Sequence, residues 1–236
     1  MITLPRIENA GISAWLVRLF EQIDDANLTP IMALARQSEH AFGAALIDLT
    51  PSYTTLLVEF DLLQMTPAQA LLKLQGLLAE FGQSEAIEEG PLKQLPVWYE
   101  ASVGPDLLHL ATRNNLSVEQ LIEWHTATIY KVFALGFAPG FAFMGSVDAR
   151  LDAPRLATPR SRVYAGSVAV AGRQTSAYPA QSPGGWNLLG RTPLTLFDRS
   201  REQMSYFQVG DRVQMLPITK QEFLRLGGDP TPQEDT

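Results

Sequence analysis

The residues best suited to bind an anion are five arginines in one acid-free segment. Between Ala153 and Phe197 the sequence contains no Asp, Glu or Lys, although the whole chain carries a net charge of −7. The arginines are Arg155, Arg160, Arg162, Arg173 and Arg191. Because the guanidinium fork matches carboxylates and phosphates, the segment predicts an anion site. Arginines on the surface of strands and loops would give the same pattern, so charge alone leaves both interpretations open.

Two short motifs in the same region combine aromatic residues with turn formers. They are Gly136-Phe-Ala-Pro-Gly-Phe141 and Ser182-Pro-Gly-Gly-Trp186. Each motif is typical of a tight turn whose aromatic side chains lie in the core. Each is equally typical of a pocket in which the aromatic side chains form an apolar wall and the glycines let backbone amides approach a ligand. Gln174 adds neutral donors and acceptors that could hold an amide. Together with the arginines, these motifs favour a pocket for a small anion.

His125 is the histidine with the best position for acid–base chemistry. It lies near the end of a predicted helix, just before the strand that leads to Gly136. A single histidine on a helix is also typical of a core or capping residue, and the sequence does not decide between the two. None of the three histidines has a second ligand at helical spacing, so we predict no metal site.

Composition and missing motifs exclude several classes of function. The 236 residues contain no cysteine, which excludes disulfides and a cysteine nucleophile and fits a cytoplasmic protein. The net negative charge argues against nucleic acid, and no apolar run is long enough to cross a membrane. The Gly185–Thr192 stretch resembles a phosphate-binding loop with Arg in place of Lys. Pro193 and a strand-like run follow it, where a phosphate-binding loop would open a helix, so we reject that interpretation.

The elements that must position these residues fall into two predicted parts. The first has strands at 12–20, 45–49 and 54–60 and helices at 24–40 and from Thr66 to Leu78. This order, followed along the chain by a further strand at 95–100, predicts a split βαβ fold. The domain itself is assigned to residues 1–88. The polar stretch 83–94, which contains Gly90-Pro91, is the predicted linker.

The second part, residues 89–228, is predicted to carry the site. Two short helices, at 105–114 and from Ser117, precede β-rich runs at 131–137, 163–171, 194–197 and 212–216. Short strands separated by Gly and Pro turns are typical of a compact β-barrel. The predicted fold class is therefore α+β, with an N-terminal split βαβ-like domain and a C-terminal β-barrel. Residues 229–236 are predicted to be a flexible tail.

The same region resembles one known family. The motifs that carry the resemblance are His125-Thr126, Tyr130-Lys-Val, Gly136–Phe141, Pro154-Arg155, Pro159-Arg160, Ala165–Val168, Ala171–Thr175, Tyr178-Pro179, Ser182–Trp186 and Gly190–Pro193. They resemble the family of the 5-oxoprolinase B subunits, the kinase inhibitor KipI and allophanate hydrolase subunit 1. The match is specific from His125 to Asp198 and looser from about Gly11 to Gly227. Ile12, Phe20, Tyr164 and Ser176 depart from the family's usual residues.

The resemblance implies a cyclophilin-like C-terminal barrel and an enzyme complex. The partners would be a C-type subunit, similar to KipA or allophanate hydrolase subunit 2, and an A-type subunit of the LamB/YcsF kind. The implied reaction converts 5-oxo-L-proline, ATP and water to L-glutamate, ADP and phosphate, with Mg²⁺ accompanying ATP. The ATP site could be shared with or located on a partner. Two alternatives remain: a KipI-like inhibitor of a sensor histidine kinase, and a component of a urea-related carboxyltransferase or allophanate hydrolase.

On this resemblance we assign hypothetical roles to individual residues. Arg160 and Arg191 would bind the carboxylate or phosphate, Gln174 would orient the lactam, and His125 would act as acid–base or orienting group. The remaining substrate contacts would come from Tyr130, Phe141, Ser182, Pro183, Gly184, Gly185 and Trp186.

Overall fold

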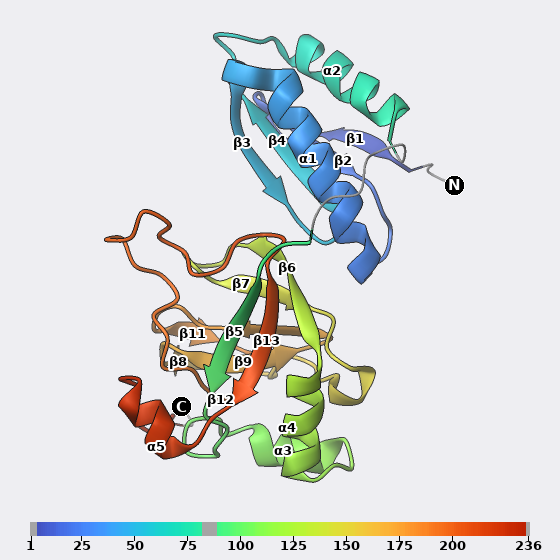
Figure 1. Ribbon diagram of the computed structural model, residues 1–236. Helices are drawn as coiled ribbons and strands as arrows, with labels where there is room; N and C mark the ends of the chain where they lie inside the picture. Colours follow the sequence, from blue (N-terminus) through green and yellow to red (C-terminus); the bar gives the residue numbers. More distant parts are fainter. Residues whose placement is uncertain (1–3, 82–88, 235–236) are drawn as a thin grey trace. The chain divides into compact units, whose positions relative to one another are not determined.

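The computed structural model describes residues 4–81 and 89–234 (Figure 1). They form two compact units that divide between Glu89 and Gly90. Each unit has its own sheet and its own hydrophobic core. The α+β class predicted from the sequence is confirmed. Within the described residues, no helix is long and apolar enough to cross a membrane.

The N-terminal unit is a four-stranded antiparallel sheet with two helices. The strands β1 (Arg6–Asn9), β2 (Ala14–Arg18), β3 (Leu46–Pro51) and β4 (Thr55–Phe60) lie in the order β1-β2-β4-β3. Since β4 pairs antiparallel with both β2 and β3, these two run parallel on either side of it. The helix α1 (Leu28–Phe42) connects them, so β2-α1-β3 is a split βαβ unit.

Helices α1 and α2 (Pro67–Ala79) bury their apolar stripes against this sheet (Figure 1). Ile31 and Leu34 of α1 and Leu74 of α2 are fully buried with the sheet residues Leu56 and Val58. The start of α2 is fixed by a capping box and by proline at the first helical position.

The C-terminal unit is built on a seven-stranded sheet that curls into a barrel (Figure 1). Its order is β12-β9-β10-β7-β6-β13-β5. The strands are β5 (Leu92–Val97), β6 (Ile129–Leu135), β7 (Ala142–Gly145), β9 (Ser167–Ala171), β10 (Gln174–Ala177), β12 (Asn187–Arg191) and β13 (Arg212–Pro217). Just after β5, the backbone of Trp98 makes two hydrogen bonds with Arg191 of β12, which join the two edges of the sheet.

The remaining elements cover the barrel. A two-stranded sheet pairs β8 (Arg160–Val163) with β11 (Ser182–Gly184). Helices α3 (Leu107–Arg113) and α4 (Val118–Ala127) precede β6, and α5 (Lys220–Arg225) follows β13. The barrel is filled by residues such as Leu95, Val132, Val170 and Met215, all fully buried. A second cluster, around Phe141, contains residues of β8, β9 and β12 together with Tyr178 and Trp186.

Three predictions about these elements differ from the structure. The strand expected at 95–100 does not join the N-terminal sheet; as β5 it pairs parallel with β13, a long-range pairing without a local signal. The run 163–171 is broken by a turn at Gly166, whose φ of +80° suits glycine. The run 194–197 contributes only an isolated bridge at Phe197. Half of the predicted linker, residues 83–88, lies outside the described residues, and its last three residues, 92–94, belong to β5.

The C-terminal segment, predicted to be a flexible tail, is packed against the barrel as far as it is described. Gln233 is buried and donates a hydrogen bond to the carbonyl of Arg162, while its amide oxygen accepts one from the backbone N–H of Tyr164. The backbone N–H of Gln233 donates to Ser102 O at 2.7 Å. Polar composition suggested disorder, but here the polar groups bind the barrel's backbone.

Candidate functional site

A small aromatic pocket lies beside the barrel, where the two motifs of the sequence meet. Its volume is about 110 Å³. The lining residues are Phe137, Phe141, Phe143, Arg155, Tyr178, Gly184, Gly185 and Trp186. Pockets for drug-sized ligands measure roughly 300–1,000 Å³, so this one suits a much smaller molecule.

The pocket walls are rings held edge-to-face. The ring centre of Phe141 lies 5.3 Å from that of Tyr178 and 5.6 Å from that of Trp186, both in T-shaped geometry. Such pairs are favourable because the positive edge of one ring meets the negative face of the other. Phe141, Tyr178 and Trp186 are almost fully buried, so they form a preformed wall.

Phe137 sits at the rim of this wall and is 65% exposed. Its φ of +70° is in the left-handed region, which a bulky residue adopts only at some energetic cost. This conformation places its ring 5.1 Å from Phe141 and 6.4 Å from Tyr178. The loop thus keeps a large aromatic side chain at the mouth, although solvent reaches most of it.

Gly184 lets the opposite wall approach the ring of Tyr178. A Cβ at this position would lie 2.3 Å from the Tyr178 hydroxyl, which is sterically impossible without movement. At Gly185 the nearest atom to an added Cβ would be Pro159 Cβ at 3.5 Å, an ordinary contact. Burial raises the pKa of Tyr178, although a hydrogen bond from the Trp186 backbone opposes the shift. The hydroxyl is therefore neutral at physiological pH.

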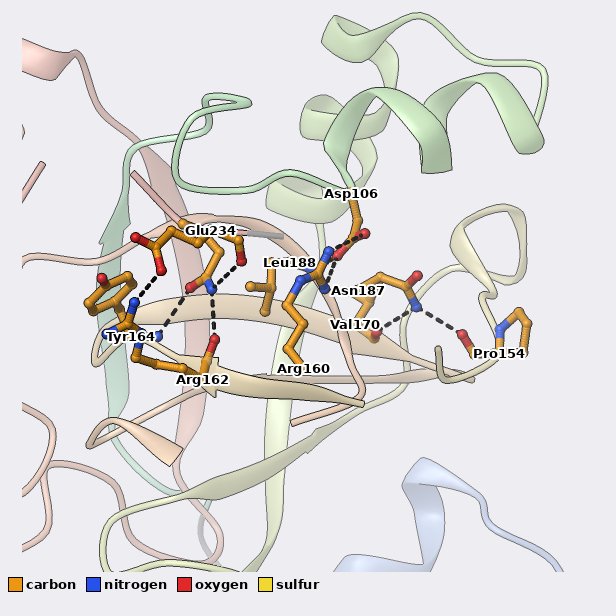
Figure 2. A network of polar contacts seen from close by, with 10 residues as sticks. Asp106, Pro154, Arg160, Arg162, Tyr164, Val170, Asn187, Leu188 and Glu234 are labelled. Atoms are coloured by element: carbon orange, nitrogen blue, oxygen red, sulfur yellow. Dashed lines mark hydrogen bonds and ion pairs between the residues drawn. The ribbon is translucent and has the colours of Figure 1, made fainter. Parts of the chain in front are cut away.

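Arg155 supplies the positive charge at the pocket. Its side chain is exposed, and its guanidinium carbon lies 5.9 Å from the centre of the Trp186 ring. The backbone on both sides of Arg155 is anchored. The carbonyl of Pro154 accepts a hydrogen bond from the Asn187 side chain at 2.9 Å, and the N–H of Leu156 donates to Gly185 O at 2.8 Å. Figure 2 shows the Asn187 bridge, which also reaches Val170.

Arg160, predicted to bind substrate, is engaged in a buried ion pair. Its two terminal nitrogens donate to the two carboxylate oxygens of Asp106 at 2.8 and 2.9 Å (Figure 2). Both side chains are about nine-tenths buried. Asp106 also accepts a hydrogen bond from the backbone N–H of Leu188 at 2.7 Å. Arg160 thus joins the start of α3 to β8 and β12 and does not line the aromatic pocket.

Arg191, the second predicted anion ligand, is buried at the end of β12. Its Nη1 donates to the carbonyls of Asp229 and Thr231, at 2.9 and 2.7 Å. The guanidinium carbon lies 5.1 Å from the centre of the Tyr164 ring, and burial lowers the pKa of the Arg191 guanidinium. The residue holds the C-terminal segment and lies outside the aromatic pocket.

His125 is fully buried in a chain of hydrogen bonds. Its Nδ1 is 2.7 Å from the Tyr99 hydroxyl, and its Nε2 is 2.9 Å from Oγ1 of Thr175. Since Thr175 donates to the carbonyl of Ala169, it accepts from Nε2–H, and Nδ1 accepts from Tyr99. Burial lowers the pKa of His125 to about 3, so the imidazole stays neutral. Tyr130, also buried, donates to the backbone carbonyl of His125.

The predicted site residues therefore divide into two groups. Phe141, Gly184, Gly185 and Trp186 meet in the aromatic pocket, and their contact with a substrate stays a prediction. The residues that do not line it are His125, Tyr130, Arg160, Gln174, Ser182, Pro183 and Arg191. His125 and Tyr130 belong to the core because their polar atoms are satisfied there. Gln174 begins β10, and Ser182 and Pro183 lie on β11.

The residue roles assigned from the sequence did not include four of the lining residues, Phe137, Phe143, Arg155 and Tyr178. The first two lie in or beside the Gly136–Phe141 motif, Arg155 belongs to the arginine cluster, and Tyr178 to the Tyr178-Pro179 motif, so each had a signal in the sequence. The sequence did not show which residue each arginine binds in the folded chain. Among the described residues, no group of three or more His, Asp or Glu side chains could hold a metal ion.

Comparison with known proteins defines the class. The sequence profile of the family described as carboxyltransferase domain, subdomain C and D, matches residues 5–207. The chain belongs to this family. The fold is shared with the urea amidolyase of K. lactis, with a TM-score of 0.77 over 93% of this chain and 15% of that one, at 20% identity.

Within the family, the chain is similar to the 5-oxoprolinase B subunit of Bacillus subtilis. The two are 34% identical over 228 residues, which cover 92% of this chain and 95% of the relative. The crystal structure of TTHA0988 is also similar, with a TM-score of 0.77 and 34% identity over 93% of this chain. This chain spans only 41% of TTHA0988. The resemblance to the 5-oxoprolinase B subunits is confirmed.

Proposed function

We propose that this chain is the B subunit of an ATP-dependent 5-oxoprolinase. With its partner subunits it would convert 5-oxo-L-proline, ATP and water to L-glutamate, ADP and phosphate. The observation that carries the proposal is the 34% identity to the B. subtilis protein, which extends over 95% of that protein. The small pocket with aromatic walls and one arginine is compatible with a five-membered lactam that bears a carboxylate.

The proposed chemistry explains why ATP is consumed. The lactam amide is stabilised by resonance, and phosphorylation of its oxygen turns it into an activated imidate that water can attack. The C–N bond of the ring then opens to give a free amine and an acyl phosphate. A second water attacks the acyl carbon, and phosphate leaves with the former lactam oxygen, so that both oxygens of the new carboxylate come from water. A protein accelerates such steps by holding the lactam in one orientation and by placing donors where charge develops.

The proposal includes the partners and the cofactor. A C-type subunit and a LamB/YcsF-like A-type subunit would complete the enzyme, and Mg²⁺-ATP would bind on a partner or at a site shared with one. The proposed location is the cytoplasm, as expected for an enzyme that consumes ATP. In this chain, Phe141 and Trp186 would flank the lactam ring, while Gly184 and Gly185 would let the backbone approach it.

The other predicted residues receive revised roles. Arg160, through Asp106, and Arg191, through the C-terminal segment, would hold the elements that surround the pocket. His125 and Tyr130 would act as positioning residues, because the hydrogen bonds of His125 link α4 to β10. Gln174 stays a prediction as a group that orients the lactam.

The test is turnover by the reconstituted complex. This chain would be co-purified with its C-type partner, supplemented with the A-type partner, and supplied with Mg²⁺-ATP and 5-oxoproline. Stoichiometric glutamate and phosphate that require this chain would support the proposal. A well-folded complex that releases neither would reject it and favour a regulatory protein, which binding to the dimerisation domain of a histidine kinase would then reveal.

A further inference from the structure

We propose that Arg155 is the residue that binds the substrate's carboxylate, and that the aromatic pocket beside it takes a small cyclic carboxylate. The identification of that ligand as 5-oxoproline rests on the proposed function. The inference that the pocket takes a small carboxylate bound by Arg155 is argued from the geometry of the pocket alone.

The first observation is how the five clustered arginines are used. Arg160 pairs with Asp106, Arg162 with Glu234, and Arg191 with two backbone carbonyls. The Nε of Arg173 donates to the carbonyl of Val147. Among the described residues, Arg155 is the member of the cluster for which no hydrogen bond or ion pair to the protein is found.

The second observation is that the unpaired guanidinium is held at the pocket mouth. Asn187 is buried and binds the carbonyl of Pro154, and the amide of Leu156 binds the carbonyl of Gly185. Arg155 lies between these two anchors and is a lining residue of the pocket. Such anchoring reduces the entropy lost when the residue binds a ligand, because the backbone is already fixed.

The third observation concerns the shape and polarity of the space. The walls are five aromatic side chains, and the volume is about 110 Å³. A flat ring of a few heavy atoms can stack against such walls, while a carboxylate at its edge can form a two-point contact with the guanidinium. The exposed ring of Phe137, kept at the rim in a left-handed conformation, would cover the ligand from the solvent side.

These features also predict selectivity. A neutral lactam of the same size would fill the aromatic walls but leave Arg155 without its anion. Hydrogen bonds to charged groups contribute about 1.5–3 kcal/mol, which corresponds to roughly 10- to 100-fold in affinity. The pocket should therefore prefer 5-oxoproline to 2-pyrrolidinone by a factor in that range.

The test measures binding and turnover separately. Binding of 5-oxoproline and of 2-pyrrolidinone to the full chain would be followed by ligand-observed NMR and calorimetry. We expect Arg155→Ala to weaken 5-oxoproline binding roughly 10- to 100-fold and leave 2-pyrrolidinone unchanged. Arg155→Lys should recover only part of the loss, because an ammonium cannot form the two-point contact. The control is Arg162→Ala, which removes a half-buried arginine of the same segment that does not line the pocket and should leave both affinities unchanged.

The outcomes distinguish this inference from the proposed function. Equal affinities of wild type and Arg155→Ala for 5-oxoproline, or no binding of either probe by the wild-type chain, would overturn the inference. An unchanged KM for 5-oxoproline in a reconstituted complex that carries Arg155→Ala would also overturn the inference. Turnover by that complex would still support the enzyme function. Binding that depends on Arg155, in a chain whose complex has no turnover, would support the carboxylate pocket and reject the proposed reaction.

Discussion

Substitution of Asp106 by alanine tests whether Arg160 has a structural role or binds a ligand. In Asp106→Ala, the guanidinium loses both of its hydrogen bonds to that carboxylate, and the N–H of Leu188 loses its acceptor. Breaking a buried pair from one side costs roughly 3–5 kcal/mol. For a chain of this size, each kcal/mol shifts the melting temperature by about 2–4 °C. We therefore expect a decrease of roughly 6–20 °C in a calorimetric scan.

The matched control is an ion pair of similar geometry on the surface. Glu222 binds Arg225 through two hydrogen bonds within α5, where both side chains are exposed to solvent. Exposed pairs contribute at most about 1 kcal/mol, so Glu222→Ala should shift the melting temperature by no more than a few degrees. If Asp106→Ala shifted it no more than this control, the reasoning would be refuted and Arg160 would again be a candidate ligand residue.

Three further perturbations follow from the same contacts, each measured by urea unfolding. His125 stays neutral in the folded chain but takes up a proton in the unfolded chain below about pH 6.5. The free energy of unfolding should therefore keep its full value above that pH and fall by about 1.4 kcal/mol per pH unit between 6.5 and 3. The variant His125→Asn should lack this slope. Gln233→Ala should cost roughly 1–3 kcal/mol, because it leaves a backbone N–H without an acceptor, and a loss below about 0.5 kcal/mol would contradict the packed C-terminal segment. Gly184→Ala should cost roughly 1–3 kcal/mol through its clash with Tyr178, whereas Gly185→Ala should be tolerated; equal effects would argue against the close approach.

Local signals were sufficient to predict many of the elements. The sequence predicted helices that begin at Thr66 and Ser117, and in the structure the side chains of these two residues cap the first turns of α2 and α4. The pairing of β5 with β13 has no such signal. It joins Leu92 to Arg212 across most of the C-terminal unit, and a strand of six residues does not identify its distant partner by its own sequence.

The arginine cluster shows why the site was harder to predict than the fold. Its segment lacks acidic residues along the chain, which suggested several free guanidinium groups for an anion. In space, however, Asp106 comes from before the segment and Glu234 from after it, and they pair with Arg160 and Arg162. The charge balance of a site has to be counted over neighbours in the fold, because an ion pair can join residues far apart in sequence. Counted in this way, the cluster leaves one side chain, Arg155, in position to meet an anion at the pocket.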